Sequence, residues 1–135
     1  MMLKQMTLYK IKIDENRSEQ VIVLKEKEGS RLLPLVIGIS EVNAIKMKLS
    51  GIQSPRPLTH DLLLSTIHNL GASLTRIYVD KLENNTFHAK LALQQNGREV
   101  TVDARPSDSI ALALRADTPI FVAEEVLEEA GINEG

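Results

Sequence analysis

The sequence predicts a single α+β domain, residues 1–135, in which a mostly antiparallel sheet carries four short helices. A chain of 135 residues fits one ordinary domain with one hydrophobic core. Short stretches that alternate apolar and polar residues and end in turn residues predict strands. The order strand-strand-strand-helix-helix is predicted twice, in repeats 4–71 and 72–131, so we expect an internal duplication.

The first repeat begins with three predicted strands. Residues 4–13 put Tyr9, Ile11 and Ile13 on one face of an extended chain, although Met6 and Leu8 fall on the opposite, lysine-bearing face. The turn "DENRS" leads to a second strand in "QVIVLKEKEG", whose last glycine permits the reversal into a third strand, "RLLPLVIG". These three stretches predict an antiparallel meander.

Two predicted helices complete the first repeat. The apolar period changes at Ser40, a candidate N-cap, and this helix should end at Gly51. The second helix should begin near Thr59, its candidate cap, and end at Gly71. Its apolar side is predicted to consist of Leu62, Leu63, Ile67 and Leu70.

The second repeat follows the same order. Strands are predicted in "SLTRIYVDKL", "TFHAKLALQ" and "REVTVDA", the last two joined by the hairpin pair Asn96-Gly97. A helix should begin near Ser107, its candidate cap, and a brief extended piece, "PIFV", precedes a last helix that begins near Ala123 and ends at Gly131.

Shifting the chain against itself supports the duplication. At a shift of 65 residues, Ile45 lies over Ile110 and Leu49 over Leu114. At a shift of 64, "PRPLTHDLL" lies over "PIFVAEEVL". The identities are few, but the apolar faces agree, which favours two copies of one unit.

Composition narrows the function. Lys and Arg number 16 against 18 Asp and Glu, a formal charge of −2, which argues against a protein that coats nucleic acid without specificity. Aromatic residues make up 3%, too few for a platform that stacks bases, and the absence of cysteine leaves oxygen or imidazole as metal ligands. The chain has no long apolar run and no signal-peptide stretch at its start, so we expect a cytoplasmic protein that does not contact membranes.

Two motifs, "RPLTHD" and "DARPSD", each combine an arginine outside a helix, a proline, a hydroxyl residue and an acid in the first turn. One account is structural: the acids complement helix dipoles, the hydroxyls cap, and the arginines pair with nearby acids. The other account is functional, and it requires the two motifs to converge in space.

In the functional account each residue type has a role. Arg56 and Arg105 would bind phosphate, and His60, Asp61 and Asp108 would be catalytic. Carboxylates suit Mg²⁺ or Mn²⁺, so the candidate metal ligands are Asp61, Asp103 and Asp108, with Glu41 as a further candidate.

The other histidines fit ordinary positions. His68 is expected on the surface, and His88 is expected to pack within a strand. The chain contains no Walker loop, Rossmann glycine fingerprint or serine nucleophile elbow.

The stretches "LPLVIG", "PRPLTHDLL", "TFHAKL", "DARPSDSIALALR" and "PIFV" occur here in that order. In this the chain resembles the bifunctional nuclease domain family, from about Gln20 to Gly131. The resemblance implies an α+β domain, a dimer in bacteria, and activity on both RNA and DNA as described for plant members. It carries over at the residues of the two motifs, and Glu41 stands where the family commonly has an acid.

The sequence therefore supports two alternative functions. The first is a nuclease that hydrolyses phosphodiester bonds of RNA or DNA with the help of Mg²⁺ or Mn²⁺, His60 carrying the proton. At this net charge we expect its affinity for the polymer to be weak. The second is a non-catalytic, dimeric binding or regulatory module that recognises a phosphate-bearing ligand or an acidic partner. We also expect a homodimer, because "TLYKIKI" and "LTRIYV" would leave sheet edges to be covered.

Overall fold

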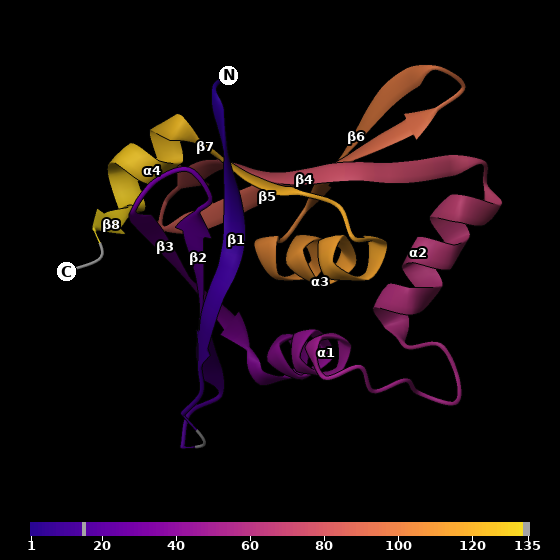
Figure 1. Ribbon diagram of the computed structural model, residues 1–135, viewed down its shortest axis with the longest axis horizontal. Coiled ribbons are helices and arrows are strands. Elements are labelled where there is room, and N and C mark those ends of the chain that lie inside the picture. The colour runs from indigo at the N-terminus through magenta and orange to yellow at the C-terminus, as the bar shows by residue number, and fades with distance from the viewer. Residues whose placement is uncertain (15, 134–135) are drawn as a thin grey trace.

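A computed structural model describes residues 1–14 and 16–133. In this part of the chain one eight-stranded sheet, with strand order β6-β5-β4-β7-β1-β2-β3-β8, carries four helices (Figure 1). All pairings except one are antiparallel, which confirms the α+β prediction. The elements are β1 (Leu3–Lys12), β2 (Glu19–Glu26), β3 (Arg31–Gly38), α1 (Ile39–Leu49), α2 (Thr59–Asn69), β4 (Ala72–Glu83), β5 (Thr86–Gln95), β6 (Arg98–Ala104), α3 (Pro106–Ala116), β7 (Ile120–Ala123), α4 (Glu124–Ala130) and β8 (Ile132–Asn133).

The sheet consists of two meanders joined by a short strand. β1-β2-β3 and β4-β5-β6 are antiparallel, as predicted for each half. β7 lies between them, antiparallel to β1 and parallel to β4. The sequence indicated an extended piece here but not its partners, and it gave no sign of β8, which pairs with β3. Both halves follow the predicted order; that they arose by duplication stays a prediction.

Strand β1 carries an irregularity that the alternation rule did not anticipate. Its register against β2 shifts between Leu8 and Lys10, so Tyr9 is the extra residue of a bulge. A bulge reverses the alternation, and Met6, Leu8 and Ile11 consequently all contact the core, while Tyr9 is exposed. The predicted apolar face of Tyr9, Ile11 and Ile13 is wrong for Tyr9 and Ile13.

All four helices begin within one residue of the predicted starts, but the predicted caps are wrong. The N-cap residues of α1, α2 and α3 are Gly38, Leu58 and Arg105, none of which makes a side-chain capping hydrogen bond. Ser40, Thr59 and Ser107 lie one or two positions inside their helices. At these helix starts the acids of the first turns, rather than the hydroxyls, are placed to interact favourably with the helix dipole.

Helix α3 is the centre of the core. It lies between the sheet and α1, with α2 beside it, whereas α4 lies near β3 and β8 (Figure 1). Six of the 11 residues of α3 are buried, so the helix has neighbours on most sides. Residues placed on the outer turns of α3 are therefore held in fixed positions relative to α1 and α2.

The apolar side of α2 differs from the prediction. Ile67 is buried, but Leu62, Leu63 and Leu70 are 60%, 40% and 70% exposed. The helix turns its Ile67 and Leu64 side to the core instead. No helix in the described ranges, 1–14 and 16–133, is both long and apolar enough to cross a membrane.

Candidate functional site

The two arginine-proline motifs converge where α2 and α3 begin. His60 is the second residue of α2, and Asp108 is the third residue of α3. The imidazole Nε2 of His60 lies 2.9 Å from Oδ1 of Asp108. The convergence that the functional account required is therefore present for this pair.

Arg105 extends the contact to a third helix. Its Nε donates to Oδ2 of Asp108 at 2.9 Å, and one terminal nitrogen donates to Oε1 of Glu41 at 3.2 Å. Glu41 stands in the first turn of α1. We call Glu41, His60, Arg105 and Asp108 the His60 cluster; it is assembled from the N-terminal ends of α1, α2 and α3.

Glycine at position 38 allows Glu41 to take this position. A Cβ at Gly38 would lie 2.5 Å from Oε2 of Glu41, closer than real Cβ contacts. The carboxylate of Glu41 therefore lies against the start of its own helix, where the helix dipole favours negative charge. A side chain at position 38 would force Oε2 of Glu41 to move.

The protonation of the His60 cluster follows from its contacts. Burial alone would raise the pKa of Asp108, but hydrogen bonds from Arg105 and His60 outweigh burial and lower that pKa below its ordinary value. Asp108 is thus ionised near neutral pH. An ionised carboxylate only accepts hydrogen bonds, so Nε2 of His60 must be the protonated nitrogen.

This arrangement prepares His60 for proton transfer. In the neutral ring, Nε2–H donates to Asp108 and Nδ1 carries the lone pair; Nδ1 has no hydrogen-bond partner among the described residues. The His60 side chain is 14% exposed, so its ring orientation is fixed by its surroundings. A histidine oriented by a carboxylate can accept and return a proton, as in general acid–base catalysis.

Arg105 is placed to bind an anion. Its side chain is 66% exposed, and its hydrogen bonds leave one terminal nitrogen, Nη1, without a partner in the described chain. The contacts with Asp108 and Glu41 raise its pKa, so it stays charged. Arg105 also lines a hollow of about 540 Å³, together with Asn85, Phe87 and Ser107.

Asp61 faces away from the His60 cluster. Its Oδ1 accepts from Nε of Arg115 at 2.7 Å, and its Oδ2 accepts from the backbone N–H of Leu58 at 3.0 Å. Burial would raise the pKa of Asp61, yet the hydrogen bonds from Arg115 and Leu58 lower it. Asp61 is therefore committed to holding the start of α2 against α3.

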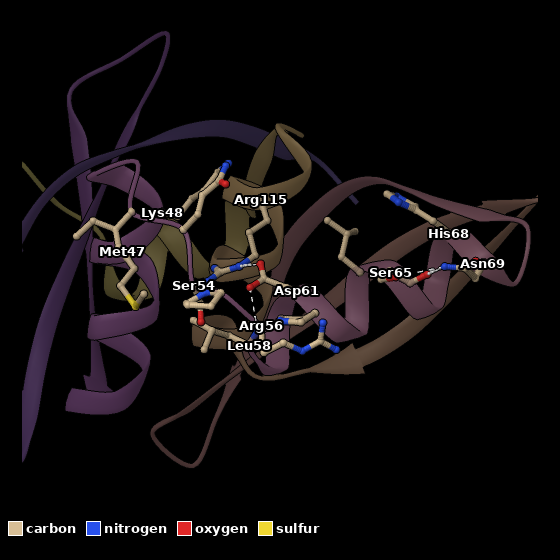
Figure 2. A pocket seen from close by; sticks show the side chains of 15 residues that line it. Met47, Lys48, Ser54, Arg56, Leu58, Asp61, Ser65, His68, Asn69 and Arg115 are labelled. Atoms are coloured by element: carbon tan, nitrogen blue, oxygen red, sulfur yellow. Dashed lines mark hydrogen bonds and ion pairs between the residues drawn. The ribbon is translucent and has the colours of Figure 1, made fainter.

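A groove of about 620 Å³ surrounds this ion pair (Figure 2). Side chains from the end of α1, the following loop and one side of α2 line it, and Arg56 is among them. Arg56 and Arg105, the two predicted phosphate ligands, line different hollows. The structure therefore splits the predicted site into the His60 cluster and this groove, which we call the α2 groove.

Sequence reasoning missed Arg115, which contacts all three helices of this region. Besides Asp61 it donates to the carbonyl oxygens of Ala111 and Ala44, each at 3.3 Å. A signal was available: Arg115 follows Asp108 by seven residues, about two turns of helix, so both lie on one side of α3. That side contacts α2 twice, through His60 and through Asp61.

Asp103 lies outside both places. It stands on β6, and its Oδ1 is 3.4 Å from Nζ of Lys90, which also contacts Asp80 at 3.1 Å. Among residues 1–14 and 16–133 no three His, Asp or Glu side chains lie close enough together to hold a metal ion. The carboxylates that the sequence suggested as ligands are each paired with a cation, so as arranged they do not fit a divalent metal.

The remaining histidines fit their expected places. His68 is exposed near the end of α2 and lines the α2 groove. His88 stands in β5, with Nε2 4.0 Å from a carboxylate oxygen of Glu83. Neither contacts the His60 cluster.

Residues 22–135 match the family model described as the bifunctional nuclease domain. An uncharacterized protein of Mycobacterium tuberculosis is 43% identical over 122 residues, which cover 90% of this chain and 73% of that protein.

Plant proteins named as nucleases are more distant. Bifunctional nuclease 1 of Oryza sativa subsp. indica is 24% identical over 126 residues, covering 90% of this chain and 38% of the rice protein. Bifunctional nuclease 1 of Arabidopsis thaliana is 30% identical over 105 residues, covering 75% of this chain and 32% of that protein. This chain thus corresponds to about a third of each plant relative.

Proposed function

Because this chain belongs to the bifunctional nuclease domain family, we propose that it hydrolyses phosphodiester bonds of RNA or DNA. The plant relatives bear the name nuclease but are far longer than the matched region, so the activity of this chain is argued from its own residues. The observation that carries the proposal is the 2.9 Å contact between His60 and Asp108, which orients a histidine as a base.

The reaction begins with proton removal. Nδ1 of His60 takes a proton from a water molecule, whose oxygen attacks phosphorus as the bond between phosphorus and the leaving oxygen breaks. The imidazolium then returns the proton to the leaving oxygen. Asp108 stabilises the imidazolium, since it already holds Nε2–H.

Arg105 supports the same step from the other side of Asp108. Its free terminal nitrogen can bind a phosphate oxygen and stabilise the charge that develops there. Arg56 lies in the α2 groove and serves the flanking part of the substrate in this proposal.

Mg²⁺ or Mn²⁺ has no step in this mechanism. Asp61 and Asp108 would have to release Arg115 and Arg105 before binding a cation, and Asp103 lies with Lys90. This mechanism therefore predicts cleavage that persists in EDTA, and loss of cleavage in EDTA would contradict it.

The test is cleavage of labelled single-stranded RNA and DNA by highly purified protein, with Mg²⁺, with Mn²⁺ and with EDTA. His60→Ala should reduce the rate by about 10²–10⁴-fold, the usual contribution of a positioned acid–base group. Asp108→Asn should also reduce it, and His88→Ala, outside the cluster, is the matched control. Activity that is absent, or that survives both cluster substitutions, would refute the proposal.

The second candidate function is a binding module without catalysis. It is favoured by Arg56, which lines the α2 groove and has no ion-pair partner among the described residues. A binding module would bind phosphate-bearing ligands through Arg56 without cleaving RNA or DNA. Cleavage that depends on His60 and Asp108 therefore separates the two functions.

A further inference from the structure

We infer that the α2 groove binds the sugar–phosphate backbone of single-stranded nucleic acid; this inference rests on the proposed nuclease function and adds a binding site to it. The groove is lined from the C-terminal end of α1, through the loop at 52–58, to the last turn of α2. None of the four residues of the His60 cluster lines the groove, although His60 stands on α2, the helix that borders it.

The first argument is charge. Three cationic side chains line the groove, Lys48, Arg56 and Arg115, against the single carboxylate of Asp61, so its formal charge is +2 in a chain of −2. Arg115 is engaged by Asp61. Lys48 and Arg56 have no ion pair with any described residue, so both remain available to phosphates.

The second argument is shape. The lining residues of α2 recur along one side of the helix, from Leu58 through Asp61 and Ser65 to Asn69 (Figure 2). At a rise of 1.5 Å per residue this stripe is about 16 Å long, which exceeds the size of a single phosphate. An open, elongated and cationic groove suits a chain of phosphates.

The third argument is the kind of contact available. Gln53, Ser54 and Asn69 offer amide and hydroxyl groups, and no Phe, Tyr or Trp of the described part of the chain lines the groove. Without aromatic stacking, affinity must come from phosphate contacts, which carry no base sequence information. The groove should therefore bind weakly, without sequence preference, and with strong dependence on salt.

The groove also meets the catalytic end of α2. Asp61 lines it at the first turn, and His60 is the adjacent residue. Because Asp61 faces away from the His60 cluster, a strand lying along α2 would have to pass around the N-terminal end of the helix to reach His60. This relation gives the groove a role in presenting a phosphodiester to His60.

The experiment measures binding apart from cleavage. A fluorescein-labelled twelve-nucleotide oligouridine is titrated with protein that carries His60→Ala. If circular dichroism shows that this variant is unfolded, His60→Gln replaces it. Anisotropy gives the affinity at several salt concentrations. Lys48→Ala and Arg56→Ala should each reduce the salt slope by about 0.7, the value for one contact with single-stranded phosphate.

Matched controls lie close by. Lys46 is exposed on α1 two residues from Lys48 but does not line the groove, and Arg98 is exposed on β6. Lys46→Ala and Arg98→Ala should leave the slope unchanged. A duplex of the same length and inorganic phosphate are the comparison ligands, and both should bind more weakly than the oligouridine.

Each outcome decides the inference. Equal effects of the groove and control substitutions, no binding of the oligouridine, equal binding of the duplex, or displacement by phosphate at oligonucleotide concentrations would overturn it. Cleavage by the wild-type protein is scored separately. If the wild-type protein does not cleave but its binding still depends on Lys48 and Arg56, the nuclease mechanism is refuted and the assignment of the groove stands.

Discussion

Replacing Arg115 by methionine tests how the start of α2 is held in place. The Arg115 side chain is 7% exposed and lies 2.7 Å from Asp61, with weaker contacts to two backbone carbonyls. A hydrogen bond to a charged group contributes about 1.5–3 kcal/mol. Asp61 is 41% exposed, so solvent screening places this pair at the lower end. Methionine keeps the apolar stem, and we expect a loss of about 2 kcal/mol of stability.

Thermal unfolding by circular dichroism measures this loss. For a domain of this size about 4 °C of Tm corresponds to 1 kcal/mol, so Arg115→Met should lower Tm by about 8 °C. Arg17→Met is the control, because Arg17 and Asp14 are 77% and 52% exposed and 3.6 Å apart. That control should change stability by less than about 0.5 kcal/mol. Asp61→Asn combined with Arg115→Met should be less damaging than the sum of both changes.

The pH dependence has a defined sign. The folded pKa of Asp61 is lowered, so its ion pair stabilises the fold above the ordinary carboxyl pKa of about 3.9 and is lost as pH falls through the lower folded value. The difference between wild type and Arg115→Met should therefore be largest near pH 7 and shrink below about pH 4. Equal Tm losses for Arg115→Met and Arg17→Met, or a difference independent of pH, would refute this reasoning.

Three further predictions concern the rest of the fold. Arg31 lies 2.7 Å from both Glu26 and Glu124 and lowers the pKa of both carboxyls, so Arg31→Met should reduce stability in urea titrations more at pH 7 than at pH 3; equal losses at the two pH values would contradict it. Asn85 has φ of 63°, so Asn85→Ala should cost about 1 kcal/mol in thermal unfolding while Asn85→Gly costs none, and the reverse order would be a failure. We expect a homodimer by light scattering at micromolar concentration and a shift to monomer in Val102→Lys on edge strand β6; a monomeric wild-type protein would remove this prediction.

Local signals predicted most of the elements. Turn residues and periodicity depend on neighbours in sequence, so the first three strands, the next three and the helix starts were all within reach. Sheet edges were not. β1 and β4, expected to leave edges exposed, are paired on both sides, because β7 inserts between them. Such pairing joins residues far apart in sequence, and no local pattern encodes it.

Side-chain direction was the harder part. One extra residue at Tyr9 reversed the alternation of β1, and α2 turned Ile67 inward while leaving Leu62 and Leu70 exposed. In both cases a stretch offered two apolar faces, and packing against α3 and β2 chose between them. For the same reason the sequence did not show that Asp103 and Asp108 lie apart. They are five residues apart, but a strand ends and a helix begins between them, so their side chains point in different directions.

The site itself shows why a structural and a functional account of the same motif were equally defensible. Glu41, Asp61 and Asp108 each occupy the third residue of a helix, a position where an acid stabilises the helix start. Asp61 serves that purpose, since it accepts the N–H of Leu58 and the guanidinium of Arg115.

Asp108 differs from Asp61 in what it contacts. One oxygen accepts from Arg105, the N-cap residue of its own helix, and the other is turned to His60 on a different helix. A cap requires only local partners, whereas the contact with His60 depends on how α2 meets α3. The stability of the helix start explains why an acid stands at this position. It does not explain why this ionised carboxylate also binds Nε2 of His60, whose Nδ1 has no partner among the described residues. That added feature points to proton transfer, and it is why Asp108 rather than Asp61 is the acid on which the proposed chemistry depends.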